Sequence, residues 1–143
     1  AVLSTFDSLN HILELDELEQ VFRNAYRALR PNGLIFFDLN MEEAFEDQWR
    51  GTWGAVEETS VGLTRGTYDP RRRLGRADVT VFRKEDNGMW SRTDVSVYER
   101  CYSEEEVIGA LERAGFVDIQ ARDAAELGMK ELASGREFFF GTK

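Results

Sequence analysis

The sequence predicts an α/β fold that carries an antiparallel β insert, and three observations support this prediction. Apolar residues recur with helical period near both ends of the chain, but this period disappears between Gly51 and Tyr102. Short apolar runs next to the helical segments are typical of buried strands. Turn signals at Asp69-Pro70 and Asp86-Asn87-Gly88 divide the middle part into strands. We therefore expect one unit over residues 1–143, with residues 51–102 as its antiparallel β insert.

The composition is that of an ordinary globular protein and excludes several classes of function. The chain has 27 acidic and 18 basic residues among 143 and a net charge of −9, which disfavours nucleic acid as a partner. No apolar stretch has the length that a membrane helix needs. Cys101 is the single cysteine, which excludes an internal disulfide and favours a cytoplasmic setting. His11 is the single histidine, and without a Cys/His cluster we expect no metal site.

The chain begins with an apolar run from Ala1 that we interpret as a buried strand. A polar loop follows it, Thr5-Phe6-Asp7-Ser8-Leu9-Asn10-His11. In α/β folds, ligands bind beyond the carboxyl ends of parallel strands. We therefore expect this loop to contribute to a binding site.

The first helix is predicted from Asp16 onward. Asp16 and Glu19 have the spacing of a capping box. One apolar face follows at helical spacing: Leu18, Val21, Phe22, Ala25 and Leu29. Pro31-Asn32-Gly33 should end this helix.

A second strand is predicted over Leu34–Phe37, and it leads into Asp38-Leu39-Asn40. Its continuous apolar character is typical of a central strand in a parallel sheet. We expect Asn40, with Glu43 three residues later, to cap a short helix that continues through Phe45 and Trp49.

The insert is expected to contain strands at Val56–Leu63, Arg76–Lys84 and Trp90–Tyr102. Alternating valines in the last two runs predict one buried and one wet face. We interpret Arg71-Arg72-Arg73 as a solvated hairpin tip.

The last part of the chain returns to helical period. Ser103 and Glu106 form a capping box for a helix with Val107, Ile108, Leu111 and Ala114 on its buried face. Gly115 is well placed as the left-handed residue that ends this helix. Two final strands are predicted at Phe116–Ala121 and Arg136–Gly141.

In this order, several segments resemble the C-terminal half of class I S-adenosylmethionine-dependent methyltransferases, most closely bacterial small-molecule members. The segments are Ser4–Ile12, Leu29-Arg30-Pro31-Asn32-Gly33, Phe37-Asp38-Leu39-Asn40 and Leu111-Glu112-Arg113-Ala114-Gly115-Phe116. The resemblance covers nearly the whole chain. Asn32 departs from the family's usual Pro-Gly-Gly.

The resemblance implies half of a Rossmann-like sheet, strands 4-5-7-6 of the family order 3-2-1-4-5-7-6. The implied cofactor is S-adenosyl-L-methionine, and the implied activity is methyl transfer to nitrogen or oxygen of a small-molecule acceptor. The family's glycine-rich turn, Gly-x-Gly-x-Gly, does not occur in this sequence. We therefore expect the chain alone to bind the cofactor weakly or not at all and to be inactive.

The resemblance also implies roles for individual residues. Thr5, Phe6 and Asp7 would line the methionine end of the cofactor. His11 is the candidate general base, because an imidazole can take a proton from an amine or a hydroxyl at neutral pH. The acceptor would be contacted by six residues: Asn10, Asn40, Trp49, Trp53, Arg100 and Tyr102. For each aromatic residue of this set, packing is the competing interpretation.

Two other functions fit the same sequence. The first is a non-catalytic α/β interaction module, which would form a homodimer through the open edge of its first strand. The second is another doubly wound enzyme, such as a nucleotide-sugar enzyme. The strand order separates this second alternative from the methyltransferases, because an antiparallel final strand between the strands that correspond to the family's fifth and sixth would mark the methyltransferase sheet.

Overall fold

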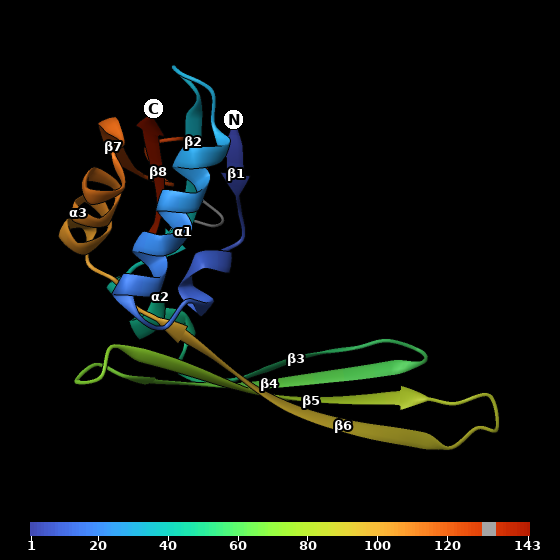
Figure 1. Cartoon of the computed structure of the whole chain (residues 1–143). Coiled ribbons are helices and arrows are strands. Elements are labelled where there is room, and N and C mark those ends of the chain that lie inside the picture. The colour runs from blue at the N-terminus through green and yellow to red at the C-terminus, as the bar shows by residue number, and fades with distance from the viewer. Residues whose placement is uncertain (130–133) are drawn as a thin grey trace.

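A computed structural model describes residues 1–129 and 134–143, and these residues form two four-stranded sheets (Figure 1). The first sheet contains β1 (Val2–Ser4), β2 (Leu34–Asn40), β8 (Arg136–Thr142) and β7 (Val117–Asp123), in that order. The second contains β3 (Gly51–Val56), β4 (Ser60–Asp69), β5 (Leu74–Lys84) and β6 (Trp90–Arg100), also in that order. The helices are α1 (Leu15–Ala28), α2 (Glu42–Gln48) and α3 (Glu104–Ala114), with a short 3-10 helix, η1, over Ser8–His11.

The strand order of the first sheet confirms the order expected for a methyltransferase sheet. β1 and β2 are parallel, and β8 lies between β2 and β7 and is antiparallel to both. Because β8 is antiparallel, its first residue, Arg136, lies opposite Asn40 at the carboxyl end of β2. The last strand therefore contributes to the edge at which α/β folds bind ligands.

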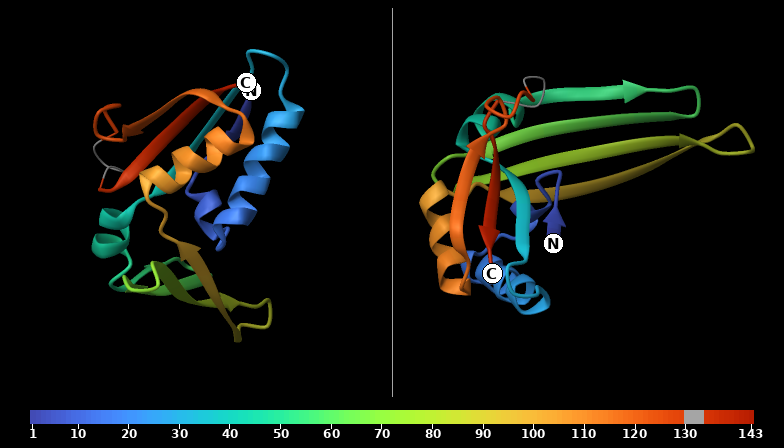
Figure 2. Two further views of the ribbon diagram at one scale, coloured as in Figure 1. Left: turned by 60° about the vertical axis from the view of Figure 1, so that its left-hand side comes forward. Right: turned by 90° about the horizontal axis from the view of Figure 1, so that it is seen from above.

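The main core lies between the first sheet and the helices α1 and α3, which cover one of its faces (Figure 2). Phe22 of α1 contacts Phe37 of β2, and Phe37 stacks on Phe139 of β8. Leu111 of α3 is completely buried in the same cluster. This core holds β1 and β2, and with them the loop that follows β1, in a fixed place.

The predicted cap of the first helix is wrong, whereas that of α3 is confirmed. α1 begins at Leu15 without a side-chain cap, and Asp16 already lies inside the helix. Glu19 instead accepts hydrogen bonds from Arg23 and from Arg113 of α3, so it links the two helices. The Ser103–Glu106 capping box is present, and Gly115 ends α3 with a φ of 106°.

Asn40 does not cap α2, contrary to the prediction. The N-cap position of α2 is Met41, which makes no side-chain cap, and α2 ends at Gln48. The Asn40 side chain is directed to Asp7, in the loop after β1. Because the side-chain amide of Asn40 is hydrogen-bonded to Asp7, it does not cap α2.

The insert contains four strands, so the predicted strand at Val56–Leu63 is wrong. Those residues span the end of β3, a reversal and the start of β4. Every residue of β3 is exposed, so the strand has no burial pattern that a sequence could reveal. The turns after Asp69 and at Asp86-Asn87-Gly88 are confirmed.

The second sheet extends away from the first (Figure 1) and is packed only near its base. A small cluster of Phe45, Trp49, Ala77 and Cys101 joins it to α2. Val97 packs against this cluster, whereas Val95 is 51% exposed, so the predicted alternation holds only at the base. We call the outer, open part of this sheet, beyond the cluster, the β arm.

The tip at Arg71-Arg72-Arg73 is not wholly solvated. The Arg73 guanidinium makes two hydrogen bonds to the Glu106 carboxylate of α3, at 3.1 and 2.7 Å. This pair fixes the β4–β5 turn to the start of α3. None of the helices in residues 1–129 and 134–143 is long and apolar enough to cross a membrane.

Candidate functional site

The loop after β1 has a strained backbone. Phe6 and Asp7 have φ values of 61° and 49°, in the left-handed region that non-glycine residues seldom occupy. The Asp7 amide donates to Asp38 Oδ2 at 3.1 Å, and Ser8 Oγ donates to the Thr5 carbonyl at 2.7 Å. Consecutive residues in this region persist only where their surroundings hold them, and such strain gathers at functional sites.

Four side chains from three elements form a charged cluster beneath this loop. Arg136 Nη2 donates to Asp7 Oδ2 at 2.8 Å, and Arg136 Nη1 pairs with Asp38. Asn40 Nδ2 also donates to Asp7 Oδ2, at 2.6 Å. The cluster thus holds two carboxylates against one guanidinium, so it has a surplus of negative charge.

A cavity of about 210 Å³ opens above the charged cluster, lined by Thr5, Phe6, Asp38, Arg136 and Phe138. Asp38 is buried, and its Oδ1 atom has no hydrogen-bond partner among the described residues. Phe6 lies at the rim, with 79% of its surface exposed. A buried carboxylate oxygen is costly unless it is paired, so this cavity favours a ligand that carries donors or positive charge.

A larger hollow of about 520 Å³ lies on the open face of the β arm. Its charged side chains already pair with one another, Arg65 with Asp78 and Arg92 with Asp94. We place the functional site at the smaller cavity, because its buried groups retain free bonding capacity.

Asn10 joins the two sheets at the border of the site. Its side chain is completely buried. Asn10 Nδ2 donates to the backbone carbonyls of Asn40 and Arg100 at 3.0 and 2.8 Å. Asn10 Oδ1 accepts from the backbone N–H of Asn40 at 2.9 Å. One side chain thereby ties η1 to the ends of β2 and β6.

His11 also contacts β6. Its Nδ1 atom lies 3.0 Å from the Tyr98 carbonyl, and its Nε2 atom lies 3.6 Å from Glu99 Oε1. The His11 side chain is half exposed, whereas Glu99 is buried. The imidazole therefore stands between solvent and a buried carboxyl group.

Glu99 is unusual among the acidic residues of the chain. Burial and, to a smaller extent, the negative charge of Asp7 together raise the pKa of its carboxyl to about 8, although Asn40 and Arg136 act in the opposite direction. Glu99 Oε2 has no partner among the described residues. A carboxyl group with such a pKa holds its proton at neutral pH.

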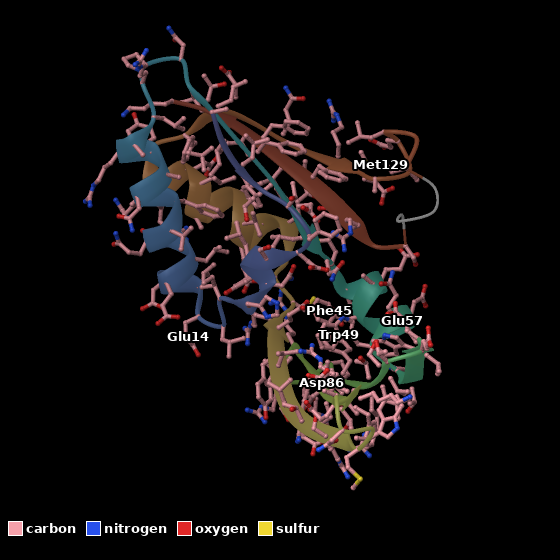
Figure 3. All side chains as sticks on the ribbon, turned by 90° about the vertical axis from the view of Figure 1, so that its right-hand side faces the viewer. Glu14, Phe45, Trp49, Glu57, Asp86 and Met129 are labelled. Atoms are coloured by element: carbon pink, nitrogen blue, oxygen red, sulfur yellow. The ribbon has the colours of Figure 1, made fainter. Side chains whose placement is uncertain are left out.

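The other predicted acceptor contacts lie apart from this cluster. Trp49 is buried against Phe45 at the base of the second sheet (Figure 3). Trp53 of β3 is exposed. Tyr102 is buried, and its hydroxyl donates to the Ile12 carbonyl at 2.6 Å. Arg100 Nη1 donates to the Arg72 carbonyl at 2.9 Å. The structure brings together Thr5, Phe6, Asp7, Asn10, His11 and Asn40. Arg100 contacts Asn10 through its backbone carbonyl only, while its guanidinium donates to Arg72, and among the described residues no hydrogen bond joins Trp49, Trp53 or Tyr102 to these six residues.

Sequence reasoning missed Arg136, which belongs to the charged cluster, and Glu99, which lies beside it. Asp38 ends the predicted second strand, and this position already indicated that it, or Asn40, could reach the acceptor. Arg136 opens the last strand, so an antiparallel final strand already predicts that it lies at the ligand edge. Glu99 gave no signal of its own. The described residues contain no group of three or more side chains that could hold a metal ion.

Comparisons with known proteins identify the fold. No protein-family model matches the chain. A protein of Geobacillus sp. (strain WCH70), named "Putative methyltransferase", is 25% identical over 140 residues, which cover 96% of this chain and 56% of the relative. The chain therefore spans little more than half the length of the curated relative that it matches.

Solved structures that resemble this chain are also methyltransferases. An S-adenosylmethionine-dependent methyltransferase from Clostridium acetobutylicum matches with a TM-score of 0.77 and 19% identity, over 98% of this chain and 56% of that one. An amino pentose methyltransferase from Micromonospora echinaspora, solved with S-adenosylmethionine bound, matches with a TM-score of 0.70 and 19% identity, over 98% and 57%. A sugar N-methyltransferase from Streptoalloteichus sp. matches with a TM-score of 0.73 and 15% identity, over 99% and 55%.

The strand order and these likenesses confirm the resemblance found in the sequence. The chain has the Rossmann-like fold of part of a class I S-adenosylmethionine-dependent methyltransferase domain.

Proposed function

We propose that this chain supplies the acceptor-facing half of a site that transfers methyl groups from S-adenosyl-L-methionine to nitrogen or oxygen of a small molecule. The observation that carries the proposal is the charged cluster of Asp7, Asp38 and Arg136 beneath the cavity at the ends of β1 and β2. Residues 1–143 would form one part of a methyltransferase domain, with residues 51–102 as its β insert.

The chemistry of the cluster fits the methionine end of this cofactor. The cofactor, when bound, supplies a methyl group on a positively charged sulfur. Asp7 and Asp38 supply more negative charge than Arg136 neutralises, and the unpaired Asp38 Oδ1 can accept from an ammonium group. Thr5 and Phe6, in the loop after β1, line the same cavity. These residues therefore attract a cationic ligand and orient it.

On the acceptor side, the proposal rests on η1 and the ends of β2 and β6. Asn10 and Asn40 fix the loop geometry, so that a nucleophile can be held in line with the methyl group. Trp53 and Arg100 remain predicted acceptor contacts at greater distance. The structural relatives that act on an amino pentose or methylate a sugar nitrogen support a small-molecule acceptor.

The proposal includes weak cofactor binding and no activity by the chain alone. The relatives are nearly twice as long over the same fold, and the glycine-rich turn expected of the family does not occur in these 143 residues. The other contacts to the cofactor would come from residues outside this sequence. A cytoplasmic setting, favoured by the lone Cys101, is part of the same proposal.

A nuclear magnetic resonance titration of the chain with S-adenosylhomocysteine at millimolar concentration tests the location of this site. We expect shifts of the Thr5, Phe6 and Asp7 amides and none in the β arm. Asp38→Asn should abolish these shifts, and the control Asp86→Asn, in an exposed turn, should leave them unchanged. Shifts confined to the β arm, or shifts of the three amides that persist in Asp38→Asn, would contradict the proposal.

The alternative function, pairing with a second copy through the open edge of β1, has one observation in its favour. Leu3 in this edge strand is 66% exposed, and β1 pairs with β2 alone among the described strands. β1 has only three residues, which limits the backbone hydrogen bonds that a partner could gain. Light scattering after size exclusion tests this alternative: a dimer that Leu3→Lys dissociates would support it, and a monomer would contradict it.

A further inference from the structure

Arg136 contributes the guanidinium of the charged cluster, and it comes from the last strand of the chain. It opens β8, where it lies opposite Asn40 at the carboxyl end of β2. The Met41 backbone N–H donates to the Gly135 carbonyl at 2.7 Å, which fixes the backbone directly before Arg136. Only 15% of the Arg136 side chain is exposed. The antiparallel last strand thus delivers one half-buried cation to the edge where the loop after β1 ends.

The guanidinium closes a ring of hydrogen bonds through this loop. Arg136 Nη1 pairs with Asp38 Oδ2, and Arg136 Nη2 donates to Asp7 Oδ2 at 2.8 Å. The same Asp38 Oδ2 atom also accepts from the Asp7 backbone N–H, at 3.1 Å. The ring therefore runs from Arg136 to Asp38, then to the Asp7 backbone, and returns through the Asp7 side chain. It joins three segments that are 31 and 98 residues apart.

The ring ties the strained part of the loop to the sheet. Asn10 anchors the far end of the loop, at η1. Between β1 and η1, Phe6 and Asp7 have left-handed backbones, and the side chain and N–H of Asp7 bond to three residues: Asp38, Asn40 and Arg136. Within the cluster, Asn40 contacts Asp7 alone, whereas Arg136 contacts both carboxylates. Strained residues persist only where such contacts hold them.

We propose that Arg136 is a positioning residue, whose guanidinium holds Asp7 and Asp38 in the geometry that forms the ligand cavity before a ligand binds. The hold on the loop follows from contacts within the chain, whereas its use for S-adenosyl-L-methionine rests on the proposed function. A planar guanidinium can donate to two carboxylates from two fixed nitrogens, but the ammonium of a lysine is a single point charge. The shape of the Arg136 side chain is therefore needed in addition to its charge.

A positioning role and a neutralising role predict opposite results for the same variant. If Arg136 only neutralised charge, Arg136→Gln would leave two carboxylates without a cation and would strengthen the binding of a cationic ligand. Arg136→Lys would then leave binding unchanged. If Arg136 positions the two carboxylates, both variants weaken binding, although Arg136→Gln makes the site more negative.

The first measurement needs no ligand. Hydrogen exchange of the Asp7 amide, which donates to Asp38, should become faster by about tenfold or more in Arg136→Lys and in Arg136→Gln. The Phe37 amide is the internal reference: it lies in the packed core and should exchange as in the unchanged chain, so that the loss is local. If Arg136→Gln does not fold, Arg136→Lys decides alone, because it keeps the charge.

Arg92→Lys is the matched control, because it removes a guanidinium from a carboxylate partner, Asp94, on the exposed β arm. It should leave the exchange of both amides unchanged. Asp7 exchange in Arg136→Lys that equals that of the unchanged chain would overturn the positioning role.

The second measurement is a titration with S-adenosyl-L-methionine, followed by the Thr5 and Phe6 amides. Both Arg136 variants should raise the dissociation constant by about tenfold, and Arg92→Lys should not change it. Equal or tighter binding by Arg136→Gln would overturn the positioning role. If the unchanged chain shows no shifts, the proposed function fails, and the exchange of the Asp7 amide still decides the role of Arg136.

Discussion

The two sheets of this chain are stabilised in different ways. In the first, Phe37 of β2 is completely buried between α1 and the neighbouring strand β8, as are Phe22 and Phe139. In the β arm, Val95 is half exposed, and charged side chains such as Arg92 and Asp94 pair across open surface. The first sheet is part of a packed layer, whereas the arm relies on strand pairing and on a small cluster at its base.

This difference explains where the candidate site lies. Strain at Phe6 and Asp7 and a buried carboxylate at Asp38 are costly, so they require a rigid support. The first sheet provides that support. The second sheet contributes at its packed base, where Glu99 and the Arg100 carbonyl contact η1.

The largest expected effect separates the two sheets by stability. Phe37→Ala should lower the free energy of unfolding by about 3–5 kcal/mol, because it leaves a cavity in a packed core. Val95→Ala in the β arm should change it by less than about 0.5 kcal/mol. Urea unfolding measures both. Equal losses would show that the arm is as tightly packed as the core.

The second prediction concerns the junction between the sheets. Asn10→Ala should cost about 2–3 kcal/mol, because the buried Asn40 amide and two carbonyls lose their partner. The control Asn24→Ala, on the exposed surface of α1, should have little effect in the same urea experiment. If both variants unfold alike, Asn10 does not join the sheets.

The third prediction uses pH. The pKa of Glu99 is raised from 4.5 to about 8 in the folded chain, so the folded chain binds its proton more tightly than the unfolded chain. This contribution to stability is complete below pH 4.5 and is lost as the pH rises toward 8. The unfolding free energy of Glu99→Gln should therefore fall less between these pH values than that of the unchanged chain. Parallel curves from urea unfolding at several pH values would contradict this.

The smallest expected effect on stability comes from the removal of a single hydroxyl group, compared at one position on each side of the junction. Ser103→Ala removes the cap of α3 and should cost about 1 kcal/mol. Ser91→Ala, in the exposed part of β6, should change the stability by less than about 0.5 kcal/mol. The midpoints of thermal unfolding would show this order, and a larger loss for Ser91→Ala would reverse the comparison.

Local signals explain which elements could be predicted from the sequence. Ser103, Glu106 and Gly115 determine the ends of α3 through contacts within a few residues, and this prediction is confirmed. Asp16 and Glu19 have the same spacing inside a helix, where Glu19 instead contacts Arg113 of a different element. β3 was missed because none of its residues is buried.

The site is harder to predict because its contacts are distant in sequence. The loop after β1 could be placed at the ligand edge from its position behind an apolar run. Arg136 contacts Asp7 across 129 residues, and Glu99 acquires its raised pKa from burial and from that same loop. Such groups become visible only when the strand order is known.

The affinity of the chain for S-adenosyl-L-methionine tests most directly the proposal that it carries only the acceptor-facing half of the site. Calorimetric titration should give a dissociation constant of about 1 mM or weaker, since the cluster around Asp38 offers only part of the contacts. A micromolar dissociation constant, about −8 kcal/mol, would mean that these 143 residues bind the cofactor on their own and would contradict the account.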